Sequence, residues 1–177
     1  MQGNEGSPVR QTDLLLISPK APAASEDLSK SDLVGLLDQP WVVRYKAHQE
    51  ILRRRGSALK QAAERFLKTP PSATNLSSLI YLAAAHGDDA SVKRIRKLAV
   101  SAEPASELAI RVMAEFPSKF EPLEMQKVLT RATSPGVRHA VLEYLHAVPE
   151  MTLPDSIVRL AAEPDAIVRQ SAAQLLA

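Results

Sequence analysis

The chain has 177 residues, enough for one domain with a sizeable core, and its 45% hydrophobic and 24% charged residues are ordinary for a globular protein. Its formal net charge of +2 is too small to indicate a nucleic-acid or membrane partner by itself, and the lack of cysteine excludes disulfides, thiolate metal sites and a cysteine nucleophile. No apolar run approaches the roughly 18–20 residues of a membrane span, and the N-terminal sequence has no apolar region typical of a secretory signal.

The first 30 residues are expected to form a flexible segment ahead of the folded domain. Residues 1–12 are polar and carry two glycines and one proline. Residues 13–18, DLLLIS, form a short apolar run that could be a strand, although a single strand has no partner here. Residues 19–30 are rich in Pro, Ala and Ser, which is typical of an extended linker.

From residue 31 onward the chain is predicted to form helices in pairs. Residues 31–38 form the first helix, capped by Ser31 and broken by Pro40. Residues 40–56 form the most clearly delimited helix, with an apolar stripe at four-residue spacing and Gly56 at its end. The other predicted helices cover residues 57–68, 73–86, 89–101, 105–116, 122–133, 135–147, 154–162 and 164–177.

A repeat of about 31 residues runs through this helical part. Five prolines near the start of each second helix are 31, 33, 31 and 29 residues apart: Pro40, Pro71, Pro104, Pro135 and Pro164. Apolar triplets follow them: Val43/Ala47/Ile51, Leu76/Ile80/Ala84, Leu108/Val112/Phe116, Val137/Val141/Leu145 and Val168/Ala172/Leu176. The pattern predicts an all-α fold, a right-handed α-solenoid of about five helix pairs, in preference to an irregular bundle. The units are residues 31–56, 57–87, 88–117, 118–149 and 150–177.

The turns between paired helices resemble those of HEAT repeats. The shared features are a turn with proline or aspartate, then Val-Arg, then small and apolar residues. They occur at Asp38 to Arg44, at Ser134 to Arg138 and at Pro164 to Arg169. The second and third units have Ser77 and Ala109 where the arginine would be, so they are assigned by spacing. The resemblance implies a HEAT-like fold, but HEAT arrays serve many unrelated functions.

A narrower resemblance concerns residues 32–56, DLVGLLDQPWVVRYKAHQEILRRRG. This segment is similar to the first HEAT unit of large bacterial membrane-bound-type dehydrogenase proteins. In those proteins a sorbosone- or glucose-dehydrogenase-like β-propeller precedes the array, and a c-type cytochrome domain often follows. The chain has no Cys-x-x-Cys-His motif, because it has no cysteine. The resemblance implies that the chain is a non-catalytic, middle part of such a protein.

Three arginines recur at one position of the second helices. They are Arg44, Arg138 and Arg169. They could form a basic ladder that binds acidic partners. They could instead pair with turn residues of neighbouring units, such as Asp38 and Asp165, and stack the repeats. We prefer the stacking interpretation, because it explains the periodicity directly.

A second set of residues consists of candidates for partner binding. The run Arg53, Arg54 and Arg55 could join Arg94 and Lys97 in a patch that faces phosphates, although acidic residues are interspersed. This patch is the basis of the alternative function, contact with nucleic acid. Trp41, the sole tryptophan, could be a binding anchor, but we favour the interpretation that it packs across the turn between two helices.

No sequence motif indicates catalysis, a cofactor or a metal. The sequence contains no Gly-rich phosphate loop, no GxSxG elbow and no HExxH motif. The histidines are widely separated, and the nearest two, His139 and His146, lie two helical turns apart rather than at ligand spacing. We therefore expect a protein that is not an enzyme and that needs no cofactor.

The function that the sequence favours is a protein-interaction scaffold or inter-domain spacer. Its second helices would line a concave surface that contacts another protein or adjacent domains of the same polypeptide. The sequence given ends in an apolar helix, SAAQLLA, without a capping glycine. This ending suggests either further repeats or self-association through the last unit. The compartment is left open.

Overall fold

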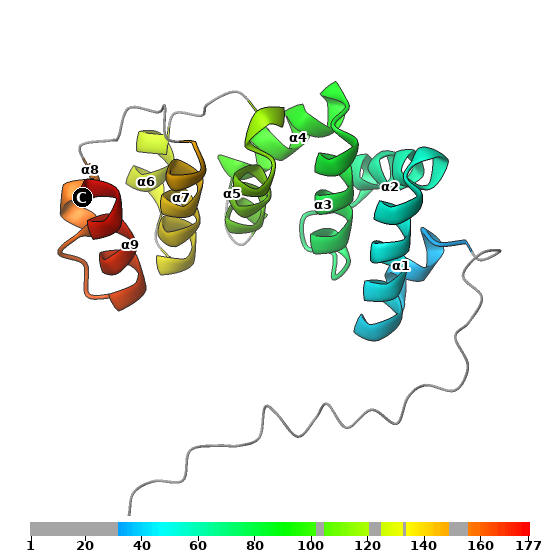
Figure 1. Cartoon of the computed structure of the whole chain (residues 1–177), viewed down its shortest axis with the longest axis horizontal. Coiled ribbons are helices and arrows are strands. Elements are labelled where there is room, and N and C mark those ends of the chain that lie inside the picture. Colours follow the sequence, from blue (N-terminus) through cyan, green and yellow to red (C-terminus); the bar gives the residue numbers. More distant parts are fainter. Residues whose placement is uncertain (1–31, 102–104, 121–124, 133, 149–155) are drawn as a thin grey trace, which may run out of the picture. The chain divides into compact units, whose positions relative to one another are not determined.

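A computed structural model describes residues 32–101, 105–120, 125–132, 134–148 and 156–177, and these residues are all-helical (Figure 1). The all-α prediction is confirmed over this part of the chain. The predicted N-terminal linker and the DLLLIS run lie outside it. The elements are η2 (Gly35–Asp38), α1 (Trp41–Arg54), α2 (Gly56–Lys68), α3 (Leu76–His86), α4 (Asp89–Ala99), α5 (Ala105–Glu115), η3 (Pro117–Lys119), α6 (Met125–Arg131), α7 (Pro135–Ala147), α8 (Ser156–Leu160) and α9 (Ala166–Leu176).

The predicted α-helix over residues 31–38 is wrong in type and length. Only Gly35–Asp38 is helical, and it is a 3₁₀ turn. The Gly35 N–H donates to Asp32 Oδ1 at 3.1 Å, and Gln39 is extended with ψ of 167°. Helical geometry is disfavoured for the residue before a proline, so Pro40 ends the helical segment before Gln39. The segment that remains is too short for a stable α-helix. Ser31, the predicted cap, lies outside the described residues.

The boundary between α1 and α2 also differs from the prediction. Arg55 makes the break with a φ of +54°, a region that favours glycine, and Gly56 begins α2 instead of closing α1. The turn is therefore one residue earlier than the glycine suggests. The other predicted boundaries within the described residues agree with the structure to within a few residues.

The second helices of the predicted pairs pack against one another in chain order. α1 packs on α3, α3 on α5, α5 on α7, and α7 on α9, while α2 packs on α4 and α6 on α8. The predicted stripes in α1, α3 and α7 supply fully buried residues such as Ile51, Ile80 and Val141. In α5 the residues with no exposed surface include Ala109 and Met113, so the buried stripe there differs from the predicted triplet. Shared burial of these faces forms the core between successive pairs.

Arg65 of α2 connects three elements at the start of this array. Its Nη1 donates to the Val34 carbonyl at 2.7 Å, and its Nη2 donates to Asp38 Oδ2 at 2.5 Å. Asp38 Oδ1 also accepts from Asn75 Nδ2, at 2.6 Å, just before α3. The hydrogen bond from Arg65 lowers the pKa of the Asp38 carboxyl. The turn before α1 is thus fixed to α2 and to the start of α3.

Arg94 of α4 makes the corresponding contact 29 residues later. Its Nη1 donates to the Phe66 carbonyl and its Nη2 to the Thr69 carbonyl, both at the end of α2. The guanidinium carbon lies 4.7 Å from the centroid of the Phe66 ring, and burial lowers the pKa of Arg94. The last carbonyls of a helix have no intrahelical donor, so an arginine from the next pair is a suitable partner. We call Arg65 and Arg94 the arginine clasps.

Replacing Arg94 by methionine should lower the free energy of unfolding by about 2 kcal/mol, because the carbonyl of the buried Thr69 would lose its donor and the Phe66 carbonyl would keep only the Thr69 N–H. Lys97→Met on the exposed side of the same helix is the matched control and should change stability by no more than about 0.5 kcal/mol. Urea denaturation followed by circular dichroism measures both. Equal effects of the two variants would contradict a clasping role for Arg94.

An aromatic row also crosses successive second helices. The ring centroid of His48 in α1 lies 5.4 Å from that of Tyr81 in α3, and Tyr81 lies 5.0 Å from Phe116 at the end of α5. His48 is half-buried, and this burial lowers its pKa. The neutral imidazole is therefore the form that packs between the helices.

The lowered pKa of His48 predicts a loss of stability in acid. The unfolded chain binds the proton near pH 6.5, whereas the folded chain binds it only at lower pH. The stability that the neutral His48 contributes is therefore fully present above pH 6.5 and is lost as the pH falls below this value. Thermal unfolding between pH 7.5 and 5 should show this decline, and His48→Gln should reduce it. His146→Gln, at an exposed position, should leave the slope as in wild type, and equal slopes for all three proteins would refute the assignment.

Candidate binding groove

An open groove with a volume of about 550 Å³ lies across three successive second helices, α5, α7 and α9. Its lining combines small and apolar residues with charged and polar ones. These residues are Arg111, Ala114, Glu115, His139, Leu142, Glu143, His146, Ala147, Ser171, Gln174 and Leu175. We call this feature the α5–α7–α9 groove.

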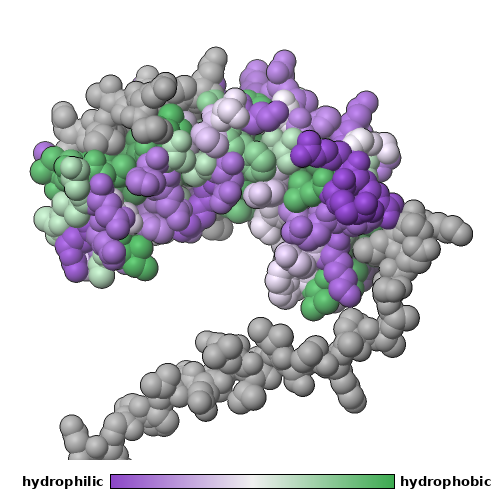
Figure 2. Space-filling model, in the orientation of Figure 1, coloured by the Kyte–Doolittle hydropathy of each residue, from purple (hydrophilic) through white to green (hydrophobic). Residues whose placement is uncertain are grey.

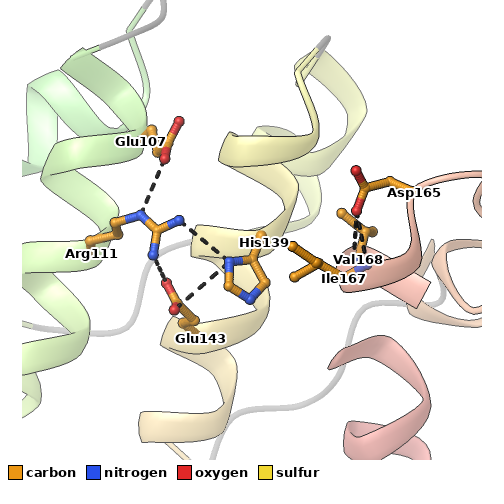
Figure 3. Close-up of polar contacts among 7 residues, drawn as sticks. All are labelled: Glu107, Arg111, His139, Glu143, Asp165, Ile167 and Val168. Carbon is orange, nitrogen blue, oxygen red and sulfur yellow. Dashed lines mark hydrogen bonds and ion pairs between the residues drawn. The ribbon is translucent and has the colours of Figure 1, made fainter. Parts of the chain in front are cut away.

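Arg111 of α5 organises the polar part of the groove (Figure 3). Its Nε donates to Glu107 Oε1 at 3.2 Å, one helical turn earlier on α5. Its Nη1 donates to Glu143 Oε2 of α7 at 2.5 Å, and its Nη2 lies 3.3 Å from His139 Nδ1. One guanidinium thus connects two carboxylates and an imidazole from two adjacent helices. Charged groups satisfied by several partners hold a more defined geometry than a single surface ion pair.

The contact with Arg111 also defines the tautomer of His139. Arginine has only donors, so His139 Nδ1 must accept, and the ring proton then resides on Nε2. Glu143 Oε1 is 3.8 Å from His139 Nδ1, which is too long for a hydrogen bond. The neutral imidazole therefore belongs to the observed network, and Glu143 Oε1 keeps acceptor capacity on the groove side.

Gly136, at the start of α7, makes room for the network. A Cβ atom at this position would lie 2.2 Å from Glu107 Oε2 and 2.8 Å from Glu107 Cδ. Such distances are far below ordinary van der Waals contact, so any larger residue would displace the Glu107 side chain. Glycine here allows the carboxylate of α5 to lie against the first turn of α7.

The groove has more acidic than basic groups. Among the described residues that line it, Arg111 is the only arginine or lysine, against the two carboxylates of Glu115 and Glu143. Glu115 is exposed, and no ion pair to it is found within the described part of the chain. With neutral histidines the lining carries a formal charge of −1. Among the described residues, no group of three or more His, Cys, Asp or Glu side chains could hold a metal ion.

The three arginines of the predicted ladder all contact turns. Arg44 donates to the Thr74 carbonyl before α3 at 3.1 Å. Arg138 donates to Glu163 Oε2 at 2.8 Å, and Arg169 donates to the Glu163 carbonyl at 2.8 Å. The acceptors differ from those expected, because they are mostly backbone carbonyls.

The two expected aspartate partners have other roles. Asp38 is bound by Arg65 and Asn75. Asp165 caps α9 by accepting from the N–H groups of Ile167 and Val168, each at 3.0 Å (Figure 3).

The residues of the predicted basic patch lie on α1, in the turn before α2, and on α4. Arg53 and Arg54 both donate to Glu50, at 2.8 Å and 2.6 Å, and these bonds lower the pKa of Glu50 to about 2. Arg55 forms the turn before α2, and Arg94 is a clasp. Lys97 is exposed on α4.

Trp41 is 63% exposed and does not pack across the turn as the sequence favoured. Its ring centroid lies 4.9 Å from that of Tyr45 in an edge arrangement, and Val42 beside it is also exposed. On the face drawn in Figure 2, hydrophilic residues cover much of the described surface, and hydrophobic residues gather in separate patches. Trp41, Val42 and Tyr45, in the first turns of α1, are all exposed.

The sequence did not reveal the charged residues that the groove uses. Glu107/Arg111 and His139/Glu143 are spaced four apart, a spacing that usually indicates an isolated pair on one helix. Their contact across α5 and α7 depends on how the two helices are aligned. This alignment could not be derived from periodicity alone.

Comparison with known proteins gave no relative. No family model, no curated protein and no solved structure matches the chain. Within the described residues, no helix has the length and apolar character needed to cross a membrane.

The contact between Arg111 and Glu143 should be measurable as a coupling between α5 and α7. Both side chains are 39% exposed, so we expect a coupling energy of only about 0.5–1 kcal/mol. The measurement is a double-mutant cycle of Arg111→Met and Glu143→Gln in urea. The cycle of Lys60→Met and Glu64→Gln, a more exposed pair at 3.9 Å, should give nearly zero. Additive effects of the Arg111 and Glu143 changes would contradict the bridge.

Proposed function

We propose that the chain is a non-catalytic protein-interaction module, in which HEAT-like helix pairs form a solenoid and the second helices carry the binding surface. Two observations support the arrangement. The helices α1, α3, α5, α7 and α9 pack in chain order, and first helices pack on first helices at α2–α4 and α6–α8. Packing between nearest neighbours on both layers is typical of repeat architectures.

The observation that carries the functional proposal is the α5–α7–α9 groove. It spans three successive units, so its length suits an extended segment of a partner better than a compact small molecule. Leu142 at its base is 1% exposed, while charged groups lie above it. A surface of this kind offers apolar contact and oriented hydrogen bonds together, which is how interfaces combine affinity with specificity.

The alternative of nucleic-acid contact has less support. Arg53 and Arg54 are bound to Glu50, and Arg94 donates to backbone carbonyls. Phosphate contact through these groups would first require loss of existing bonds. A role as spacer in a dehydrogenase-type polypeptide is compatible with the same fold, and the groove would then receive a segment of a neighbouring domain. Self-association through the exposed Val158, Ile167 and Leu176 is a further proposal for the last pair.

A groove-filling variant tests the proposal. Peptides of 12 residues from a random display library would be selected on the wild-type chain and then measured by fluorescence polarisation. Ser171→Trp places a large side chain in the groove and should weaken the selected binders at least about tenfold, because it excludes the peptide from its contacts.

Ala173→Trp, on an exposed position of the same helix outside the groove lining, is the matched control and should leave binding unchanged. Binders that tolerate Ser171→Trp would show that the interaction surface lies elsewhere. Salt-sensitive binding of mixed duplex and single-stranded DNA that withstands the same change would favour the nucleic-acid alternative instead.

A further inference from the structure

We propose that the α5–α7–α9 groove recognises a basic side chain, an arginine above all, on an exposed segment of a partner protein. The inference rests on the proposed function and specifies the chemistry of its partner. It follows from a comparison of two sets of polar groups in the groove. One set already has hydrogen-bond partners within the protein, and the other can still bind a ligand.

The first step concerns Arg111, the only cation among the described residues that line the groove. Three of its five N–H groups already point to acceptors, two of them on α7 and one on α5. An acidic ligand could reach only the remaining N–H groups, which lie beside the carboxylates of Glu107 and Glu143. Those two carboxylates outweigh the single charge of Arg111, which opposes binding of an anion.

The second step concerns the hydrogen-bond acceptors of the groove that receive no hydrogen bond from Arg111. Glu143 uses Oε2 for Arg111, while its Oε1 has no hydrogen bond to His139 at 3.8 Å. The exposed carboxylate of Glu115 lines the same groove, and the side chain of Gln174 on α9 adds an amide oxygen. Two carboxylates against one cation, with oxygens still able to accept, are complementary to a guanidinium or ammonium group.

The third step concerns the apolar part of the lining. Ala114, Leu142, Ala147 and Leu175 surround these acceptors with small and aliphatic surface. Arginine and lysine bury an aliphatic stem along apolar surface and keep the charged head among polar groups. A planar guanidinium can also bond two acceptors at once, and for this reason we favour arginine over lysine.

Glu115 gives the cleanest test, because it contributes charge to the groove and is not part of the Arg111 network. The selected 12-residue peptides should contain more arginine than the unselected library. Each carboxylate lost from the groove should then weaken an arginine-containing binder by roughly three- to tenfold, at 0.15 M salt. The variants are Glu115→Gln and Glu143→Gln, and the control is Glu64→Gln on α2, which removes the same charge away from the groove. Replacing the arginine of the peptide by citrulline removes the charge from the partner side and should produce a comparable loss.

The outcomes separate the two proposals. Arginine-enriched binders that weaken with Glu115→Gln but not with Glu64→Gln support the inference. Binders that are blocked by Ser171→Trp yet are neutral or acidic, or are indifferent to both carboxylate variants, overturn the inference and leave the proposed function in place. Failure to select any binder that Ser171→Trp blocks would overturn both. Thermal unfolding of each variant within about 3 °C of wild type confirms that the fold is retained.

Discussion

Hydrogen bonds from arginine side chains, to backbone carbonyls or to carboxylates, connect each described helix pair of this protein to its neighbour. Arg65 of α2 binds the Val34 carbonyl just before η2, and Arg94 of α4 binds the Phe66 and Thr69 carbonyls at the end of α2. Arg44 of α1 donates to the Thr74 carbonyl in the turn before α3. Helix ends packed between neighbours are poorly accessible to water, so their carbonyls need donors from the protein. A long, permanently charged side chain with several N–H groups can supply them across the gap between two pairs.

The groove depends on how the second helices α5, α7 and α9 are aligned with one another. With α5 packed on α7, Arg111 reaches Glu143 and His139 on the next helix, and Gly136 leaves the space that Glu107 occupies. The charged network therefore exists only when neighbouring second helices hold their register. It fixes the polar part of a surface whose base is the buried Leu142, and it leaves the acceptors of Glu115 and Glu143 facing the groove. In our proposal, the contacts that stabilise the stack also set the charge of the binding surface.

Much of the fold could be predicted from the sequence, because helix-breaking residues and the spacing of apolar residues are local signals. Pro135 predicted the start of α7, and Val137, Val141 and Leu145 predicted its buried side. The prediction failed where local preferences competed, as at Gly35, where Asp32 and Pro40 impose a 3₁₀ turn, and at Arg55, which adopts positive φ ahead of Gly56. The site was less predictable, since Arg94 and Arg111 both look in the sequence like ordinary polar positions of amphipathic helices. Only the neighbouring helix decides that one binds carbonyls and the other carboxylates.

The most direct test of this account is nuclear magnetic resonance of arginine side chains in uniformly ¹⁵N-labelled protein. Rotation about the Nε–Cζ bond averages the Nη protons of a free guanidinium, whereas stable hydrogen bonds at both Nη atoms slow this rotation and the exchange with water. The account predicts separate, slowly exchanging Nη resonances for Arg65 and Arg94, and a single averaged signal for Arg55 in its exposed turn. Averaged signals for Arg65 and Arg94, indistinguishable from that of Arg55, would contradict the claim that arginine contacts with carbonyls connect the helix pairs.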